Sequence, residues 1–173
     1  MKDIELRLIS ELIKNSRRSD RELAKAVGTS QPTVTRIRTK LEEKGYIKEY
    51  TAIPDFKKLG YEILALHFVQ LKKGLSEEEV EEARKTAREN LDKVPLGIIM
   101  IERGIGLDYN GVLVSYHKNY ASYLELLSWL KNFTAIPIAR IDSFLVSLSD
   151  EVHYLPLTFA VLAKHIALLN SES

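Results

Sequence analysis

Seven polar side chains fall within positions 31 to 40, and they are of the types that bind a polyanion. They are Gln31, Thr33, Thr35, Arg36, Arg38, Thr39 and Lys40. Gln and Arg can each make two parallel hydrogen bonds to a base edge, while Thr and Lys suit phosphates and thymine methyl groups. The stretch therefore predicts a surface that binds DNA. Between them, Val34, Ile37 and Leu41 recur at helical spacing and predict the buried side of the same helix.

The residues before this stretch predict two helices that support it. Residues 3–14 carry apolar side chains at helical spacing. Ser19 or Asp20 can cap a second helix, and Glu22 lies close to a capping-box position. Gly28 ends that helix, as a residue that must adopt a positive φ does.

The third helix has its own boundary residues. Ser30 can cap it, and Pro32 falls in its first turn, where a missing N–H costs little. Gly45 ends it, and the alternating stretch at 46–53 predicts a strand or small hairpin. This order of elements is that of a winged helix-turn-helix. The alternative is an ordinary helical hairpin with a solvated charged face, which the caps, the turn glycine and the predicted hairpin together disfavour.

Charge is unevenly distributed along the 173 residues. Residues 1–50 hold 12 Lys/Arg and 8 Asp/Glu, a net charge of +4, whereas residues 51–173 hold 13 and 16, a net charge of −3. This asymmetry suits a polyanion-binding module attached to a second domain. Arg17, Arg18 and Lys48 are expected to hold phosphates beside the predicted recognition helix.

Other features limit the function classes. There is no Cys, which excludes disulfides and thiolate metal sites, and no apolar run of roughly 18 residues suggests a membrane span. The four histidines, His67, His117, His153 and His165, show no metal-ligand spacing and are expected in a core or an interface. We expect a cytoplasmic protein without a metal or cofactor, and not an enzyme.

The second half of the chain predicts the order βαββαβ. The strands are expected at 61–71, 96–104, 111–117 and 138–148, and the helices at 76–91 and 120–133. This is the ferredoxin-like arrangement, so the whole chain is of the α+β class. Its helices cover one face of the sheet, and an uncovered apolar face predicts self-association.

Four segments follow from these patterns. They are a winged helix-turn-helix at 1–53, a linker at 54–60, a ferredoxin-like assembly domain at 61–149 and a helical extension at 150–173. In the extension, Pro156 can start a final helix over 157–169. Its apolar face is expected to pack on the chain's own sheet or on a partner subunit.

Four short motifs occur in order along the predicted winged helix-turn-helix: "RELA" at 21–24, "VGTSQPTV" at 27–34, "LEEKGYI" at 41–47 and "YT" at 50–51. Through these motifs, residues 3–149 resemble the Lrp/AsnC family of bacterial and archaeal transcription regulators. It implies a dimer formed through the C-terminal sheet, further assembly, and an amino-acid effector bound between dimers. The family has two adjacent basic residues before an aliphatic one in the recognition helix. Here Ile37 separates Arg36 from Arg38. This difference suggests that buried and exposed positions of the recognition helix are exchanged at this point.

The family's effector region carries Gly and Asp in the turn between the second and third strands. The corresponding candidates here are Gly104, Gly106, Asp108 and Asn110, in the predicted turn "GIGLDYN" at 104–110. The resemblance thus implies a DNA-binding regulator, dimeric or larger. Two alternatives remain open: a siroheme-decarboxylase-like enzyme on the same two-domain fold, which needs a tetrapyrrole pocket lined by basic and His residues, and a DNA-binding assembly protein without an effector.

Overall fold

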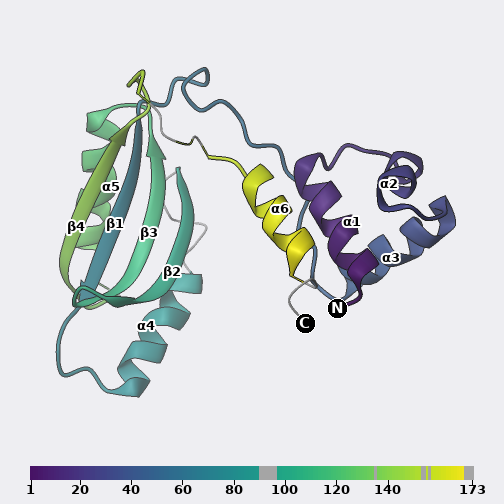
Figure 1. Cartoon of the computed structure of the whole chain (residues 1–173). Helices are drawn as coiled ribbons and strands as arrows, with labels where there is room; N and C mark the ends of the chain where they lie inside the picture. The colour runs from purple at the N-terminus through teal and green to yellow at the C-terminus, as the bar shows by residue number, and fades with distance from the viewer. Residues whose placement is uncertain (90–96, 135, 153–154, 156, 170–173) are drawn as a thin grey trace. The chain divides into compact units, whose positions relative to one another are not determined.

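The computed structural model describes residues 1–89, 97–134, 136–152, 155 and 157–169 and divides the chain into two compact units (Figure 1). The first unit comprises Met1–Ile53 together with the C-terminal segment from His153, and the second comprises Pro54–Val152. Among the described helices, none is long and apolar enough to cross a membrane.

The described residues of the first unit form four helices. They are α1 (Asp3–Lys14), α2 (Asp20–Val27), α3 (Gln31–Glu43) and α6 (Ala160–Leu168). The predicted helix boundaries of α2 are confirmed: Ser19 and Glu22 form a capping box, and Gly28 has a φ of 72°. Ser30 caps α3, with Pro32 in its first turn.

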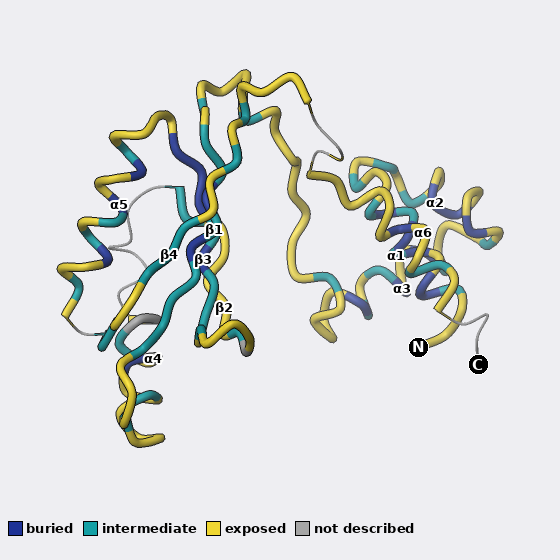
Figure 2. The backbone as a smooth tube through the Cα atoms, turned by 60° about the vertical axis from the view of Figure 1, so that its left-hand side comes forward, coloured by how far each residue is buried: buried dark blue, intermediate teal, exposed yellow. Residues whose placement is uncertain are grey.

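One core holds the first three helices together. Its buried residues are Leu8, Leu12, Leu23, Ala24, Val27, Val34, Ile37 and Leu41. The predicted buried stripe of α3 is therefore confirmed, and Figure 2 shows dark blue, buried segments in α1, α2 and α3. Because the stripe is buried, the other faces of α3 are the ones available to a ligand.

The predicted strand or hairpin at 46–53 is wrong. No strand forms over these residues, nor elsewhere among the described residues of the first unit. Instead, Ile47 packs against the helical core, and its N–H donates to Leu41 O. The alternation reflects this single inward residue between exposed neighbours, and a strand also needs a paired neighbour.

The second unit is built on an antiparallel four-stranded sheet. The strands are β1 (Ile63–Leu71), β2 (Ile98–Gly106), β3 (Tyr109–His117) and β4 (Ile138–Ser147), in the order β2-β3-β1-β4. With α4 (Glu77–Glu89) and α5 (Tyr120–Asn132), this confirms the ferredoxin-like fold. The part of the helix predicted beyond Glu89 lies outside the described residues.

The turn between β2 and β3 is shorter than predicted. Gly106 pairs with Tyr109, so only Leu107 and Asp108 form the loop. Both have positive φ, 51° and 62°. Such a two-residue turn matches the twist of the flanking strands, which explains why both strands extend into the stretch expected to be loop.

The sheet has one face packed against α5 and one more open face. Helix α5 lies against one face of the sheet (Figure 1). On that side, Leu113 packs with Leu126 and Leu130. On the other face, Leu66 lies opposite Phe144 and Val114. Phe144 is 64% exposed, so the open face that was expected from the strand sequences is present.

Residues 54–60, the predicted linker, make contacts within the second unit. Phe56 stacks on Tyr116 with ring centroids 3.7 Å apart. Gly60 N–H donates to Lys57 O, and Tyr61 N–H donates to Phe56 O, which closes a turn. The change from one unit to the other accordingly falls after Ile53.

Candidate nucleic-acid interface

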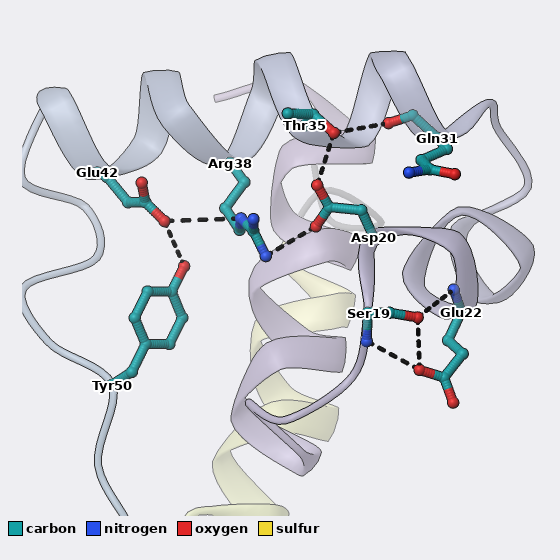
Figure 3. A network of polar contacts seen from close by, with 8 residues as sticks. All are labelled: Ser19, Asp20, Glu22, Gln31, Thr35, Arg38, Glu42 and Tyr50. Atoms are coloured by element: carbon teal, nitrogen blue, oxygen red, sulfur yellow. Dashed lines mark hydrogen bonds and ion pairs between the residues drawn. The ribbon is translucent and has the colours of Figure 1, made fainter.

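Asp20, at the start of α2, joins two predicted DNA-binding residues of α3. Thr35 Oγ1 donates a hydrogen bond to Asp20 Oδ2 at 2.6 Å, and Arg38 Nη1 lies 2.7 Å from Asp20 Oδ1. Thr35 also donates to the Gln31 carbonyl at 3.1 Å. Figure 3 shows these side chains pointing toward one another from the two helices. The contacts fix α3 against α2.

The Asp20 carboxylate depends on Arg38. Its side chain is only 11% exposed, and the buried Oδ1 accepts no hydrogen bond. A buried charge is costly unless an opposite charge lies close to it. Arg38 supplies that charge and also lies 3.7 Å from Glu42. Arg38, predicted to contact DNA, is therefore held by two carboxylates of its own chain.

The opposite flank of α3 is attached to α1. Lys40 pairs with Glu5, which is 5% exposed. The pKa of Glu5 is lowered, chiefly by the hydrogen bond from Lys40 and then by the backbone N–H of Lys2. Thr33 lies 2.9 Å from Ser30 through their hydroxyls. Two more of the predicted residues thus have partners within the helical unit.

A shallow hollow of about 160 Å³ lies between α1 and α3. Its lining residues are Lys2, Ile4, Glu5, Thr33, Arg36, Ile37 and Lys40. Three of them are cationic and one is a carboxylate. The flank beside Arg36 is therefore positive overall.

Four predicted residues of α3 are exposed, and one of them, Thr35, is bonded to Asp20. The other three are Gln31, Arg36 and Thr39. Arg36 has no ion-pair partner among the residues that the structure describes. Ile37 is only 7% exposed, so the suggested exchange of buried and exposed positions does not occur. Gln31, Arg36 and Thr39 form what we call the outer row of α3. In this row, the Gln31 and Arg36 side chains can each make paired hydrogen bonds to a base edge.

The flanking cations differ in their contacts. Arg18 pairs with Glu11, whose pKa is lowered, first by its hydrogen bond with Lys14. Arg17 and Lys48 are exposed and form no ion pair within the described part of the chain. They are the two flanking cations left available to phosphates.

The contacts by which Asp20, Glu5 and Tyr50 hold residues of α3 were not anticipated from the sequence. Tyr50 OH donates to Glu42 at 2.6 Å (Figure 3). Burial, and then this hydrogen bond, raises the pKa of Tyr50 to about 12. Opposite charges at positions 20 and 38 were the only available signal, and their pairing becomes visible only once the two helices are placed together.

The four residues proposed for an effector are close together in sequence, but two already have partners. Gln70 Nε2 donates to Asp108 O at 2.8 Å and to its Oδ2 at 2.6 Å. Asn110 Oδ1 accepts from Leu71 N–H at 2.8 Å. Both side chains tie the hairpin to the end of β1. Gly104 and Gly106 lie in β2, with no atom within 4 Å of where a Cβ would be.

Two of the histidines form a buried network under α5. His67 Nδ1 is 2.9 Å from Ser143 Oγ, and its Nε2 is 2.9 Å from Ser115 Oγ. Ser115 Oγ is also 2.8 Å from His117 Nε2. Burial, and then the nearby His117, lowers the pKa of His67 to about 4. Among the described residues, no three His, Asp or Glu side chains could hold a metal ion together.

Comparison with known proteins assigns the chain to a family. A family model described as winged helix-turn-helix DNA-binding matches residues 1–48. The HTH-type transcriptional regulator FL11 of Pyrococcus horikoshii is 32% identical over 135 residues, covering 78% of this chain and 81% of FL11. The HTH-type regulator LrpC of Bacillus subtilis is 49% identical over 57 residues, covering 33% of this chain and 40% of LrpC. The chain belongs to the Lrp/AsnC family.

Solved structures of other proteins, among them LrpC and a transcriptional regulator, share the fold. LrpC of Bacillus subtilis has a TM-score of 0.68 at 24% identity, over 90% of this chain and 99% of that one. A Neisseria meningitidis regulator, solved as a complex with L-Met, has a TM-score of 0.69 at 15% identity, over 94% and 99%. In sequence, an HTH-type regulator of Pyrococcus furiosus is 32% identical over 106 residues, which is 61% of this chain and 66% of that protein. The alignments therefore cover less than two thirds of this relative and of LrpC.

Proposed function

We propose that this Lrp/AsnC-family protein is a sequence-specific DNA-binding transcriptional regulator in which the outer row of α3 reads the bases. The observation that carries this proposal is the exposure of Gln31, Arg36 and Thr39 on a helix held on both flanks. A helix fixed in this way presents its side chains without a large ordering cost on binding. Arg17 and Lys48 supply phosphate contacts.

The protein acts as a dimer or larger assembly. Leu66, Val114 and Phe144 lie on the open face of the sheet, and Val114 is opposite Met100, which is 40% exposed. A second copy that covers this face buries a continuous apolar surface. Two α3 helices related by a two-fold axis then enter successive major grooves. The expected site is a pseudo-palindrome whose half-sites lie about 34–36 Å apart, or a multiple of that.

A gel-shift titration tests this function. The purified protein is added to DNA from upstream of its own gene at two salt concentrations, with a scrambled DNA of equal length as control. A discrete shift that is stronger on the upstream DNA and weakens steeply with salt is expected. Equal binding to both DNAs at every salt concentration counts against sequence-specific recognition of that site.

An amino acid is the second partner that we propose. The support is the L-Met complex of the Neisseria meningitidis regulator and the hairpin turn that contains Asp108. Ligand binding there changes the contacts that Asp108 makes to Gln70 and shifts the assembly equilibrium. Titration calorimetry with each of the twenty amino acids tests this, and heats equal to the dilution blank for all of them exclude the effector. An effector-independent assembly protein is then the remaining form of the regulator.

The enzyme alternative is less well supported. A tetrapyrrole pocket needs accessible His and basic side chains. His67 and His117 are 0% and 3% exposed and are engaged with Ser115. The relatives compared above are also named as regulators. An absorbance titration with siroheme distinguishes the two functions, because a shifted Soret band at stoichiometric protein would support the enzyme.

A further inference from the structure

Helix α1 is buried on two sides. Leu8 and Leu12 face the core shared with α2 and α3. Ser10 lies between them in sequence, which places it about 200° around the helix from Leu8. It is nevertheless only 2% exposed. A second element must therefore cover the back of α1.

That element is α6, which runs along α1 within the same unit (Figure 1). Ser10 Oγ donates a hydrogen bond to the Ala163 carbonyl at 2.7 Å, and Ala163 is fully buried. Small side chains at both positions let the two helices approach closely. This arrangement differs from both expected positions for the C-terminal helix, the chain's own sheet and a partner subunit.

The contact involves only one side of α6. Ile166 and Ala167 are half-buried on the side of Ala163, whereas Val161 is 57% and Leu168 is 59% exposed. The helix has nine residues, a length at which an isolated helix is unstable in water. Formation of α6 therefore depends on its contact with α1. Substitution at Ala163 is expected to break this contact and to unfold α6.

Docking of α6 changes how the two units are connected. The chain leaves the first unit after Ile53 and returns to it after Val152. Without α6 in place, one segment joins the units and leaves their mutual orientation free. With α6 attached to α1, two segments join them, and fewer orientations are accessible.

We propose that α6 is a clamp that restricts the orientation of the DNA-binding unit relative to the sheet unit. The consequence for DNA rests on the proposed function: a clamped assembly accepts a narrow range of half-site spacings. Release of α6 from α1 allows a wider range.

Spin-label distances test the clamp without DNA. The chain has no Cys, so Lys25→Cys in α2 and Glu125→Cys in α5 introduce two labels at exposed positions, one in each unit. Labelled chains are refolded with a tenfold excess of unlabelled chain, which suppresses distances between subunits. Ala163→Glu places a charge in the buried contact, and Val161→Glu places the same charge on the exposed side of α6 as a matched control.

The clamp predicts a narrow distance distribution in the parent and in Val161→Glu, and one at least twice as broad in Ala163→Glu. Equal widths in the parent and Ala163→Glu overturn it. Ser10→Leu crowds the same contact from α1 and is used if Ala163→Glu loses the circular dichroism signal of a folded chain. The same outcomes apply to this variant.

DNA binding to operators of different half-site spacing tests whether the clamp restricts the spacings that the assembly accepts. A series of operators that differ in spacing by half a helical turn is titrated with the same three proteins. The parent and Val161→Glu should prefer one spacing at least tenfold, and Ala163→Glu should prefer it less than threefold. An unchanged tenfold preference in Ala163→Glu overturns the role in spacing. Absence of specific binding by the parent overturns the proposed function instead, and the distance distributions then decide on the clamp alone.

Discussion

At the scale of single residues, the structure distinguishes side chains of α3 that are free to contact bases from side chains that hold the helix in place. Arg36 points away from the core without an ion-pair partner in the described part of the chain, whereas Arg38 is paired with Asp20 and Glu42. Both were predicted to contact DNA on the basis of residue type alone. Their environments now assign them different tasks, because a side chain already bound to a carboxylate must give up that contact to bind a base.

Arg36→Ala is expected to weaken specific DNA binding by about 1–3 kcal/mol, the size of one lost bidentate base contact. Arg36→Lys keeps the charge but loses the paired donors, so it should keep the salt dependence and lose sequence preference. Fluorescence anisotropy with cognate and single-substitution DNAs measures both. An Arg36→Ala protein that prefers the cognate sequence as strongly as the parent would remove Arg36 from the readout.

Leu107 is a second residue with a local consequence. It is 86% exposed and has a φ of 51°, in the region that disfavours residues with a Cβ. Leu107→Asn should raise the free energy of unfolding by about 1 kcal/mol, because Asn tolerates this conformation. Leu107→Ala lacks the short polar side chain with which Asn hydrogen-bonds locally in this conformation, so it serves as control, with no gain expected. Urea denaturation compares the variants, and equal gains for both would show that loss of the exposed side chain, not backbone strain, is responsible.

At the scale of elements, one ion pair supports the packing of α3 on α2 beside their shared apolar core. Arg38→Ala leaves the Asp20 carboxylate buried without its cation and should lower the free energy of unfolding by about 1–3 kcal/mol. Asp20→Asn in the same chain should recover part of that loss, because no charge is then left unpaired. A double-mutant cycle by urea denaturation measures the coupling. Additive effects of the two substitutions would mean that the pair does not act as a unit.

The histidine network joins three strands, and His67 stacks on Tyr123 of α5, which makes this packing sensitive to pH. Each neutral imidazole donates through one nitrogen and accepts through the other, and the single Ser115 hydroxyl hydrogen serves only one ring. The network therefore suits neutral histidines. The pKa of His117 is also lowered, chiefly by burial.

The sign of the pH effect follows from the lowered pKa. In the unfolded chain His67 takes up a proton near its ordinary pKa of 6.5, and in the folded chain only near about 4. Stability is thus fully present above pH 6.5 and is lost as pH falls toward 4. Between pH 7.5 and pH 5 this amounts to about 2 kcal/mol. Denaturant titrations at both pH values measure the loss, which should shrink in His67→Gln and persist in His165→Gln, a substitution at an exposed position. A full loss in His67→Gln would assign it to other groups.

At the scale of the whole molecule, the open sheet face should control assembly. Phe144→Glu places a charge in that face and should convert the assembly to monomers at micromolar concentration. Leu124→Glu, at an exposed position of α5, makes the same chemical change elsewhere and should leave the assembly intact. Sedimentation velocity measures the outcome. An unchanged sedimentation coefficient for Phe144→Glu would place the subunit contact on another surface.

Much of this architecture could be predicted from the sequence because its signals are local. Ser19, Gly28 and Pro32 determine helix ends through their own backbone preferences, and the stripe containing Val34 identifies the inner side of α3. Pairings such as Asp20 with Arg38 join residues far apart in the sequence, so spacing alone did not reveal them. The strand prediction at 46–53 was wrong for a related reason. Alternation of apolar and polar residues indicates a strand only where a neighbouring strand is available for pairing.

The most direct test of the account is a gel-shift titration of the parent, Arg36→Ala and Arg17→Ala on upstream and scrambled DNA at two salt concentrations. The parent is expected to prefer the upstream DNA. Arg36→Ala should lose that preference, and Arg17→Ala should bind both DNAs more weakly by a similar factor, with a salt slope reduced by about 1. Unaltered preference and affinity in Arg36→Ala, on a DNA that the parent recognises, would contradict the claim that the outer row of α3 reads the sequence.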